Sequence, residues 1–420
     1  MFVAPTLIQS IGAALFAVAL VHTFSTKFFE RMAHRRPDHA GIWHLLGEVE
    51  IVFGVWAGAL ILAMMLVAGR DSAPRYLDSR DFTEPLFVFA IMVIAGSRPI
   101  LELANAVVGR IARALPVRDA RSLYFSVLAF VPLLGSFITE PAAMTLAALI
   151  LRDRFFAAGL PNRLKYATVG TLFVNISIGG ALTSFAAPPI LMVAGKWGWD
   201  TAFMASTFGW RAAGAVIVNA LVVTYLYRRE LAALETPPEA ARLSLPLPVV
   251  LLHAGLLASV VVFSHHPALF LGLLLLFLGF ATAYPKFQDR IILREGLLVA
   301  FFLAGLVVLG GQQRWWLEPL LRGMDATAVF YGATALTAVT DNAALTFLAS
   351  LVDGLSGEFK YSLVAGAITG GGLTVIANAP NPAGFSILRH SFHDEAIHPW
   401  GLFTAALVPT AVAVAFFQLP

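Results

Sequence analysis

The sequence lacks cysteine and carries little charge. None of its 420 residues is Cys, which excludes a disulfide framework and a thiolate metal site. Charged residues are 13% of the chain, against roughly 25% in soluble domains. Hydrophobic residues are 59%, the mean hydropathy is +0.80, and a net charge of +3 gives no indication of nucleic-acid binding. This balance predicts an all-α polytopic membrane protein whose main partner is the lipid bilayer.

Apolar runs of membrane-spanning length recur along the whole chain. The first 25 residues have no basic start and no evident cleavage site, so we expect a retained helix and not a signal peptide. The predicted spans lie near 5–25, 42–67, 84–108, 166–195, 201–227, 246–263, 267–284, 294–312, 361–388 and 400–418.

Two further apolar segments, 123–156 and 326–353, are interrupted by similar motifs. Residues 139–145 read TEPAAMT, and 201 positions later residues 340–346 read TDNAALT. Each motif places a carboxylate, Glu140 or Asp341, inside an apolar stretch. Because an acid in a continuous span would be costly in hydrocarbon, we predict two re-entrant hairpins of half-helices that break at mid-depth.

A glycine-rich motif follows each hairpin. Residues 179–183 read GGALT before a Pro-Pro pair, and residues 370–374 read GGGLT before Pro380 and Pro382. Glycine permits close helix approach and proline interrupts a helix, so we predict two broken transmembrane helices. Two motifs in the same order indicate an internal duplication. Paired broken segments in corresponding positions point to a transporter's binding site.

The distribution of Lys and Arg predicts that the repeat is inverted. With the N-terminus outside, most basic residues fall in cytoplasmic loops, as expected for a membrane protein. Basic residues flank the first hairpin (Arg121 and Arg152 among them), whereas the loops around the second are sparsely basic. The two hairpins would therefore enter from opposite faces. We expect a bacterial inner-membrane protein.

These patterns divide the chain into five regions, and a homodimer is left open. The predicted regions are 1–79 (N-terminal scaffold helices), 80–227 (first inverted repeat with hairpin 123–156), 228–245 (cytoplasmic linker), 246–284 (scaffold helices) and 285–420 (second inverted repeat with hairpin 326–353 and a C-terminal helix).

The interrupted segments offer oxygen ligands for a small cation. Unwound carbonyls, hydroxyls, amides and carboxylates suit alkali or alkaline-earth ions better than transition metals. We expect Glu140 and Asp341 to be Na⁺ ligands. The full predicted proton- and cation-binding set is Glu140, Asp341, Asn342, Thr139, Thr340, Thr145 and Thr346, with Thr183, Ser184, Thr374, Asn378 and Asn381 lining the broken helices.

A carboxylate in the membrane can also exchange a proton. Burial favours its protonated form and a bound cation favours its ionised form, so cation and proton compete. That competition is the minimal mechanism of an antiporter. The alternatives are a structural polar contact at each tip and, for the Thr hydroxyls, a bond back to the carbonyl four residues earlier.

Other polar residues in the apolar runs have roles that the sequence leaves open. Glu48, Glu50 and Glu102 lie in or near predicted spans. His44 and Glu48 are one turn apart and could form a second proton relay or an interface contact. Arg98 and Glu102 have the spacing of a structural ion pair.

A histidine-containing loop near the C-terminus resembles a metal site only at first sight. Its spacing is not His-Glu-x-x-His, which favours a solvated surface turn. The loop contains His390, His393, Asp394, Glu395 and His398.

These motifs resemble those of the ion transporter superfamily, which includes sodium/proton antiporters, arsenite permeases and divalent-anion/sodium symporters. Thr340-Asp341-Asn342 is similar to the hairpin tip of the antiporter and arsenite-permease branch. Over residues 80–390 the chain resembles a family of putative sodium/proton antiporters. Glu140-Pro141 departs from it, because many relatives carry a neutral or Asp-Asn tip there. Neither tip has the Ser-Asn-Thr of the anion symporters, which argues against an organic anion.

The resemblance implies a secondary active transporter and not an enzyme. We expect a cation/proton antiporter with alternating access, in which Na⁺ and H⁺ are cargo and no resident cofactor is needed. The alternative is a Na⁺- or H⁺-coupled anion symporter or permease. An intramembrane enzyme would need a nucleophile and base pair that we do not find. The sequence does not decide among Na⁺, Li⁺, K⁺ and Ca²⁺, and it does not fix the stoichiometry.

Overall fold

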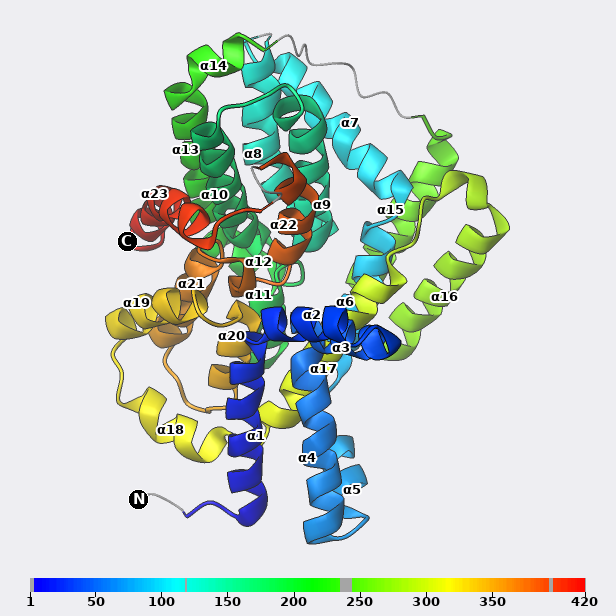
Figure 1. Ribbon diagram of the computed structural model, residues 1–420, viewed down its shortest axis with the longest axis vertical. Coiled ribbons are helices and arrows are strands. Elements are labelled where there is room, and N and C mark those ends of the chain that lie inside the picture. The colour runs from blue at the N-terminus through cyan, green and yellow to red at the C-terminus, as the bar shows by residue number, and fades with distance from the viewer. Residues whose placement is uncertain (1–3, 118, 235–243, 393–395, 420) are drawn as a thin grey trace.

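The computed structural model describes residues 4–117, 119–234, 244–392 and 396–419, and the regular structure of these residues is entirely helical (Figure 1). Within them, 5 helices are long and apolar enough to cross a membrane, or up to 6 if one bent pair is a single span. The predicted all-α polytopic class is therefore confirmed.

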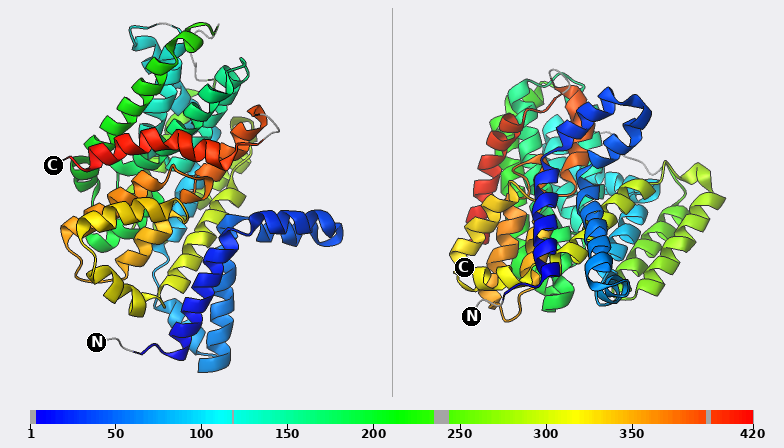
Figure 2. Two further views of the ribbon diagram at one scale, coloured as in Figure 1. Left: turned by 60° about the vertical axis from the view of Figure 1, so that its left-hand side comes forward. Right: turned by 60° about the horizontal axis from the view of Figure 1, so that its bottom comes forward.

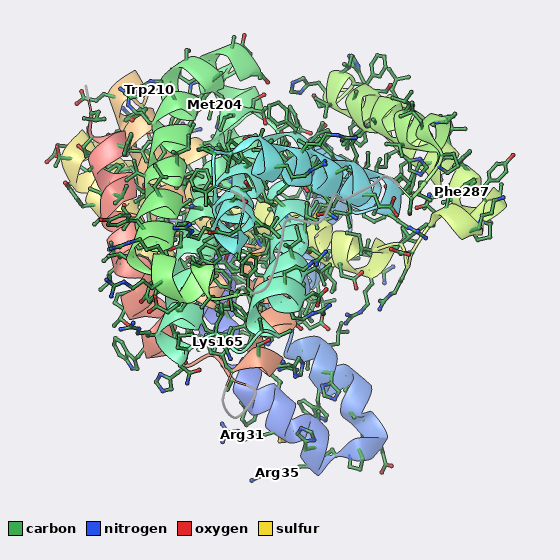
Figure 3. The ribbon with its side chains drawn as sticks, turned by 90° about the horizontal axis from the view of Figure 1, so that it is seen from above. Arg31, Arg35, Lys165, Met204, Trp210 and Phe287 are labelled. Carbon is green, nitrogen blue, oxygen red and sulfur yellow. The ribbon has the colours of Figure 1, made fainter. Side chains whose placement is uncertain are left out.

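The N-terminal region contains two helices side by side, α1 (Leu7–Thr23) and α4 (Val52–Ala68) (Figure 1). Between them, α2 (Thr26–Arg35) and α3 (Ala40–Leu46) pack on each other and project from the body (Figure 2). Figure 3 shows Arg31 and Arg35 at the outer side of this projection. The 3₁₀ turn η1 (Pro37–His39) joins the two helices.

The predicted span near 42–67 is confirmed over Val49–Ala68, whereas its first residues belong to a separate helix. Helix α3 ends at Gly47, Glu48 is extended, and the 3₁₀ turn η2 (Val49–Ile51) leads into α4. The physical reason is local: Gly47 favours a helix end, and an acid in an apolar helix is stabilised where the helix stops. Helix α5 (Ser72–Asp78) follows α4.

The predicted span 84–108 is not a straight helix, because two helices occupy it. Helices α6 (Thr83–Ala95) and α7 (Arg98–Ala114) meet at a bend of 68°. Gly96 ends the first, and Pro99, in the first turn of the second, cannot donate to a preceding turn. Arg98 therefore begins α7. Its guanidinium lies 2.9 Å from Glu102, so the predicted ion pair is confirmed.

The first interrupted segment contains α8 (Ala120–Ile138) and α9 (Glu140–Leu151), which pack on each other and are separated by Thr139 alone. The π-helical turn η3 (Arg152–Phe156) ends α9. The following broken helix contains α10 (Asn162–Gly179), the 3₁₀ turn η4 (Gly180–Leu182) and α11 (Pro188–Trp197).

The second interrupted segment contains α19 (Ala326–Thr337) and α20 (Asn342–Ser350), joined by four residues. Helix α19 packs mainly on α21, and α20 packs mainly on α11 of the other half. The second broken helix contains α21 (Gly357–Gly370), the 3₁₀ turn η7 (Val375–Ala377) and α22 (Asn381–Leu388). Both predicted pairs of interruptions are thus present.

The remaining helices surround this centre. Helices α15 and α16 pack on α6, α17 packs on α4 and α6, and α23 packs on α10 and α13. Of the predicted linker, residues 235–243 lie outside the described residues. The bounds are α12 (Thr201–Met204), η5 (Ala205–Gly209), α13 (Trp210–Leu226), α14 (Arg228–Ala232), α15 (Leu247–Val262), α16 (Pro267–Ala283), η6 (Pro285–Phe287), α17 (Leu293–Gly310), α18 (Arg314–Arg322), η8 (Arg389–Ser391) and α23 (Pro399–Phe417).

The two broken helices meet in the centre of the molecule. Ser177 Oγ of α10 donates to the carbonyl of Ile368 in α21 at 2.7 Å. Gly372 lies directly against the backbone of Val174, where a Cβ atom would clash. This close approach brings the ends of both broken helices, and the hairpin tips beside them, into one buried region.

Candidate ion-binding site

The glycines of the broken helices allow the hairpins to approach closely. A Cβ atom on Gly179 would lie 2.6 Å from the carbonyl oxygen of Pro132 in α8. In the second half, a Cβ atom on Gly370 would collide with the carbonyl of Thr334 in α19. Since only glycine fits such contacts, the glycine motif places each hairpin against its own broken helix.

The threonine of each glycine motif then holds the end of the first hairpin arm. Thr183 Oγ1 donates to the carbonyl of Ser136 at 2.7 Å. Thr374 Oγ1 donates to the carbonyl of Ala338 at 2.9 Å. Carbonyls at a helix end have no partner in the helix, so both bonds satisfy groups that the break leaves free. The two halves use the same residue for the same contact.

Glu140 lies in the first turn of α9 and is fully buried. Its Oε2 accepts a hydrogen bond from Asn378 Nδ2 at 2.9 Å, across the two halves. Its Oε1 has no partner among the protein atoms, and a Cβ atom on Gly180 would lie 2.5 Å from it. The first tip therefore presents one carboxylate oxygen that can accept a cation or a proton.

Asp341 caps the N-terminus of α20. Its Oδ1 accepts from the backbone N–H groups of Ala343 at 2.8 Å and Ala344 at 3.1 Å. The next residue, Asn342, is fully buried, and both polar atoms of its amide lack a protein partner. Both tip acids therefore lie at the N-terminus of the second arm of their hairpin.

The other predicted ligands differ in whether their polar atoms already have a hydrogen-bond partner in the protein. Thr139 is 3% exposed, and its Oγ1 has no protein partner. The hydroxyls of Thr145 and Thr346 donate to the carbonyls four residues earlier, Pro141 at 2.9 Å and Asn342 at 3.3 Å. The alternative interpretation of the sequence, in which each hydroxyl bonds back to its own helix, is therefore correct for these two bonds. Each hydroxyl oxygen still has lone pairs that can accept. Thr340 is partly exposed.

The lining residues of the second break are more polar than those of the first. Asn381 Nδ2 donates to the carbonyls of Gly371 at 2.7 Å and Thr374 at 2.8 Å, which closes the unwound segment on itself. Ser184, in the first break, lies apart from the acids, with its Oγ 3.4 Å from Thr201 Oγ1.

Asn378 bonds to one acid and shares a small cavity with the other. Besides its bond to Glu140, it lines a cavity of about 20 Å³ together with Asp341 and Glu50. Glu50 was not predicted as a site residue, because the sequence left its role open. An acid inside an apolar run beside Gly47 was the available signal.

A much larger vestibule, of about 1020 Å³, lies near Ser184 and Phe347 of α20. Its polar lining includes residues of the loops after α5, α11 and α15, such as Asp81, Asp200 and His265, and residues of helices α6 and α11, such as Glu84 and Lys196. All three loops belong to the face that the sequence predicts to be outside. The vestibule therefore connects this predicted face with Ser184 of the first break.

The sequence left the role of His44 and Glu48 open, and in the structure Glu48 makes an ion pair with Arg294 of α17. The ring of His44 lies 6.4 Å from that of His34. In the C-terminal loop, residues 393–395 lie outside the described residues. Elsewhere in the described part of the chain, no group of three or more His, Asp and Glu side chains could hold a metal ion.

An all-helical chain with apolar spans and acids at helix breaks has the features of a membrane ion transporter. A family model described as Putative Na⁺/H⁺ antiporter matches residues 7–420, so the chain belongs to that family. This is a family of transporters and not a class of enzymes. A comparison with curated proteins found no match.

Proposed function

We propose that this protein exchanges Na⁺ for H⁺, and that Glu140 and Asp341 bind either ion. The observation that carries the proposal is that Asn378 bonds to Glu140 and lines a small cavity with Asp341, beside unpartnered buried polar atoms. Glu140 Oε1, Asn342 Oδ1 and Thr139 Oγ1 all lack a protein partner. These neutral and anionic oxygens form a donor set that suits Na⁺.

The proposed exchange follows from competition for the same oxygens. A bound Na⁺ stabilises both carboxylates in the ionised form, and its release into a buried region favours protonation. The site therefore exchanges one bound ion for the other, while its net charge stays approximately the same. Direct repulsion between the ionised acids, which are close enough to interact, also favours at least one proton when the cation leaves.

Alternating access would act through the duplicated elements. We propose that the two hairpins are re-entrant from opposite faces, as an inverted repeat with the N-terminus outside. The vestibule supports this topology, because its polar loops all fall on the predicted outer face. Rocking of one repeat against the other around a fixed site is the general behaviour of such transporters.

Proteoliposomes with an enclosed pH-sensitive dye test this function. A pulse of Na⁺ should move protons in the opposite direction, and pulses of Li⁺, K⁺ and Ca²⁺ rank the cations. Empty liposomes are the control. If no cation moves protons, the proposal is wrong. Anion uptake that requires Na⁺ would instead support a coupled symporter.

Cation affinity should fall as the pH falls. While the site is protonated, each drop of one pH unit should raise the apparent Kd for Na⁺ about tenfold per displaced proton, and about a hundredfold for two. Because the two acids interact, the slope belongs to the pair. Titration of Na⁺-driven exchange from roughly pH 5 to pH 9 measures it. A flat profile would exclude competition.

A further inference from the structure

Helices α2 and α3 form a hairpin that projects from one end of α1 and α4 (Figure 2). The base of this projection is fixed to both helices. His22 Nε2 of α1 lies 2.9 Å from the carbonyl oxygen of Leu46, and His22 Nδ1 accepts a hydrogen bond from Trp56 Nε1 of α4 at 3.0 Å. Both α1 and α4 are apolar, and the segment Val49–Ala68 is long enough to cross a membrane. The projection is therefore held where two membrane helices end, at the level of a bilayer surface.

One face of the projection carries exposed apolar side chains. The turn η1 reverses the chain, so α2 and α3 run antiparallel, and the rings of Phe29 and Trp43 stack between them at 6.2 Å. In an antiparallel pair, the residues one position before this contact, Phe28 and Ile42, lie on the same face. Both are exposed, and so is Leu45, one turn after Ile42. Large apolar side chains gathered on one exposed face indicate an interaction surface.

The same projection is basic. Segment 26–46 has four Lys and Arg residues against two acids, a formal charge of +2. Arg31 and Arg35 follow Phe28 by three and seven positions, so they share its face of α2, and Figure 3 shows both at the outer side. Arg35 and Arg36 are exposed and form no ion pair among the described residues. A second copy of the chain would bring like charges together here, whereas an anionic lipid surface would neutralise them.

We propose that the α2–α3 hairpin lies on the bilayer surface and binds the headgroups of anionic phospholipids. Phe28, Ile42 and Leu45 enter the boundary between the headgroups and the acyl chains, and Arg35 and Arg36 contact lipid phosphates. Apolar side chains beside basic ones are the arrangement by which amphipathic helices bind such surfaces. The distribution of Lys and Arg makes this surface the cytoplasmic one. This lipid contact is independent of the proposed Na⁺/H⁺ exchange.

A nitroxide spin label on one introduced cysteine tests this contact, since the chain has no cysteine of its own. Gly41→Cys places the label beside Ile42, where nothing lies within 4 Å of an added Cβ atom. The full-length protein is reconstituted in nanodiscs of phosphatidylcholine with or without phosphatidylglycerol. We expect an immobilised label with phosphatidylglycerol and a larger mobile fraction without it. Arg35→Gln with Arg36→Gln should lower the ratio of immobilised to mobile label about 25-fold in the anionic nanodiscs, because each basic side chain near such a surface contributes about a fivefold factor.

Arg70→Gln with Arg75→Gln is the matched control, because it removes two charges beyond the opposite end of α4 and should leave the ratio unchanged. Added salt should mobilise the label without any arginine substitution, which tests the contact even if the double variant does not fold. A label that is equally immobilised in both lipid mixtures, or mobile in both, would overturn the proposal. Spin–spin broadening between two labelled copies would also overturn it, in favour of a dimer contact at this face.

Discussion

The two halves of the molecule share the contacts that hold each hairpin arm, and they differ in the acids at the hairpin tips. In both, a glycine pair fits against a hairpin arm and a threonine holds the end of that arm. At the tips the halves diverge. Glu140 is fully buried and bonded to the other half, whereas Asp341 is partly exposed and caps its own helix. The two halves thus share the same hairpin contacts and differ in the environments of their tip acids.

The strongest test of this comparison replaces each acid by its amide. Asp341→Asn should abolish Na⁺-driven proton movement and leave the fold intact, because Asn caps a helix as well as Asp. Glu140→Gln should also abolish it or sharply weaken the apparent Na⁺ affinity. Both effects follow because an amide can coordinate a cation but cannot titrate. Dye-based exchange in proteoliposomes measures them.

Asp341→Ala is the control for capping. It should lower the free energy of unfolding by about 1 kcal/mol relative to Asp341→Asn, since the cap is lost. Wild-type exchange in both amide variants would reduce the two acids to structural roles, and the difference between the halves would then have no functional meaning.

An intermediate effect is expected from the glycines beside the tips. Gly180→Ala would push a methyl group against Glu140, and Gly371→Ala would push one to within 2.8 Å of Asn342 Nδ2. Each should destabilise the protein by about 1–3 kcal/mol through overpacking. Thermal unfolding in detergent measures the change.

Gly272→Ala in α16 is the matched control, because nothing lies within 4 Å of its added Cβ atom. It should be neutral or stabilising by up to about 1 kcal/mol, since Ala is the better helix former. Equal effects in all three variants would contradict the tight contacts at the tips.

The smallest effect concerns the first residues of the two hairpins. Asp119 caps α8 and pairs with Arg121 at 2.6 Å, while Asp325 caps α19 and has no ion pair among the described residues. The hydrogen bond from Arg121 lowers the pKa of Asp119. Asp119→Asn keeps a cap and loses the pair, so it should cost about 0.2–1 kcal/mol at neutral pH.

The pH dependence of that loss has a definite sign. A lowered pKa stabilises the folded state above the unfolded value and loses this contribution as the pH falls through the folded one. The difference between wild type and Asp119→Asn should therefore begin to shrink near pH 4 and vanish once the pH is below the lowered pKa of the folded state. Unfolding midpoints of wild type and Asp119→Asn at several pH values and low salt test this.

Much of the fold was predictable because its breaks have strong local signals. Glycine pairs, prolines and isolated acids marked the interruptions near Glu140, Asp341, Gly180 and Pro380. The bend at Gly96 and the break at Gly47 had similar signals. The mean hydropathy of the segments around them was nevertheless high, so each segment was predicted as one span. Hydropathy identifies how much of a segment is apolar and not whether it is straight.

The composition of the site was less predictable than its location. The bond between Asn378 and Glu140 joins residues 238 positions apart, and neither periodicity nor spacing encodes it. The approach of Glu50 to Asp341 depends on how η2 packs on α17. Tertiary packing determines which distant residues come into contact. A single sequence therefore identifies the candidate acids but not which of them lie close together.

Thr139 at the first tip adopts a strained backbone conformation. It is the only non-glycine residue with positive φ among the described residues, at φ 74° and ψ 149°. That conformation costs a β-branched residue about 1–3 kcal/mol, and glycine would adopt it freely. The chain has 34 glycines and uses four of them at other positive-φ positions. A glycine at 139 would avoid this strain, so the threonine side chain is tolerated there at a cost in backbone energy, beside the acid of the first tip.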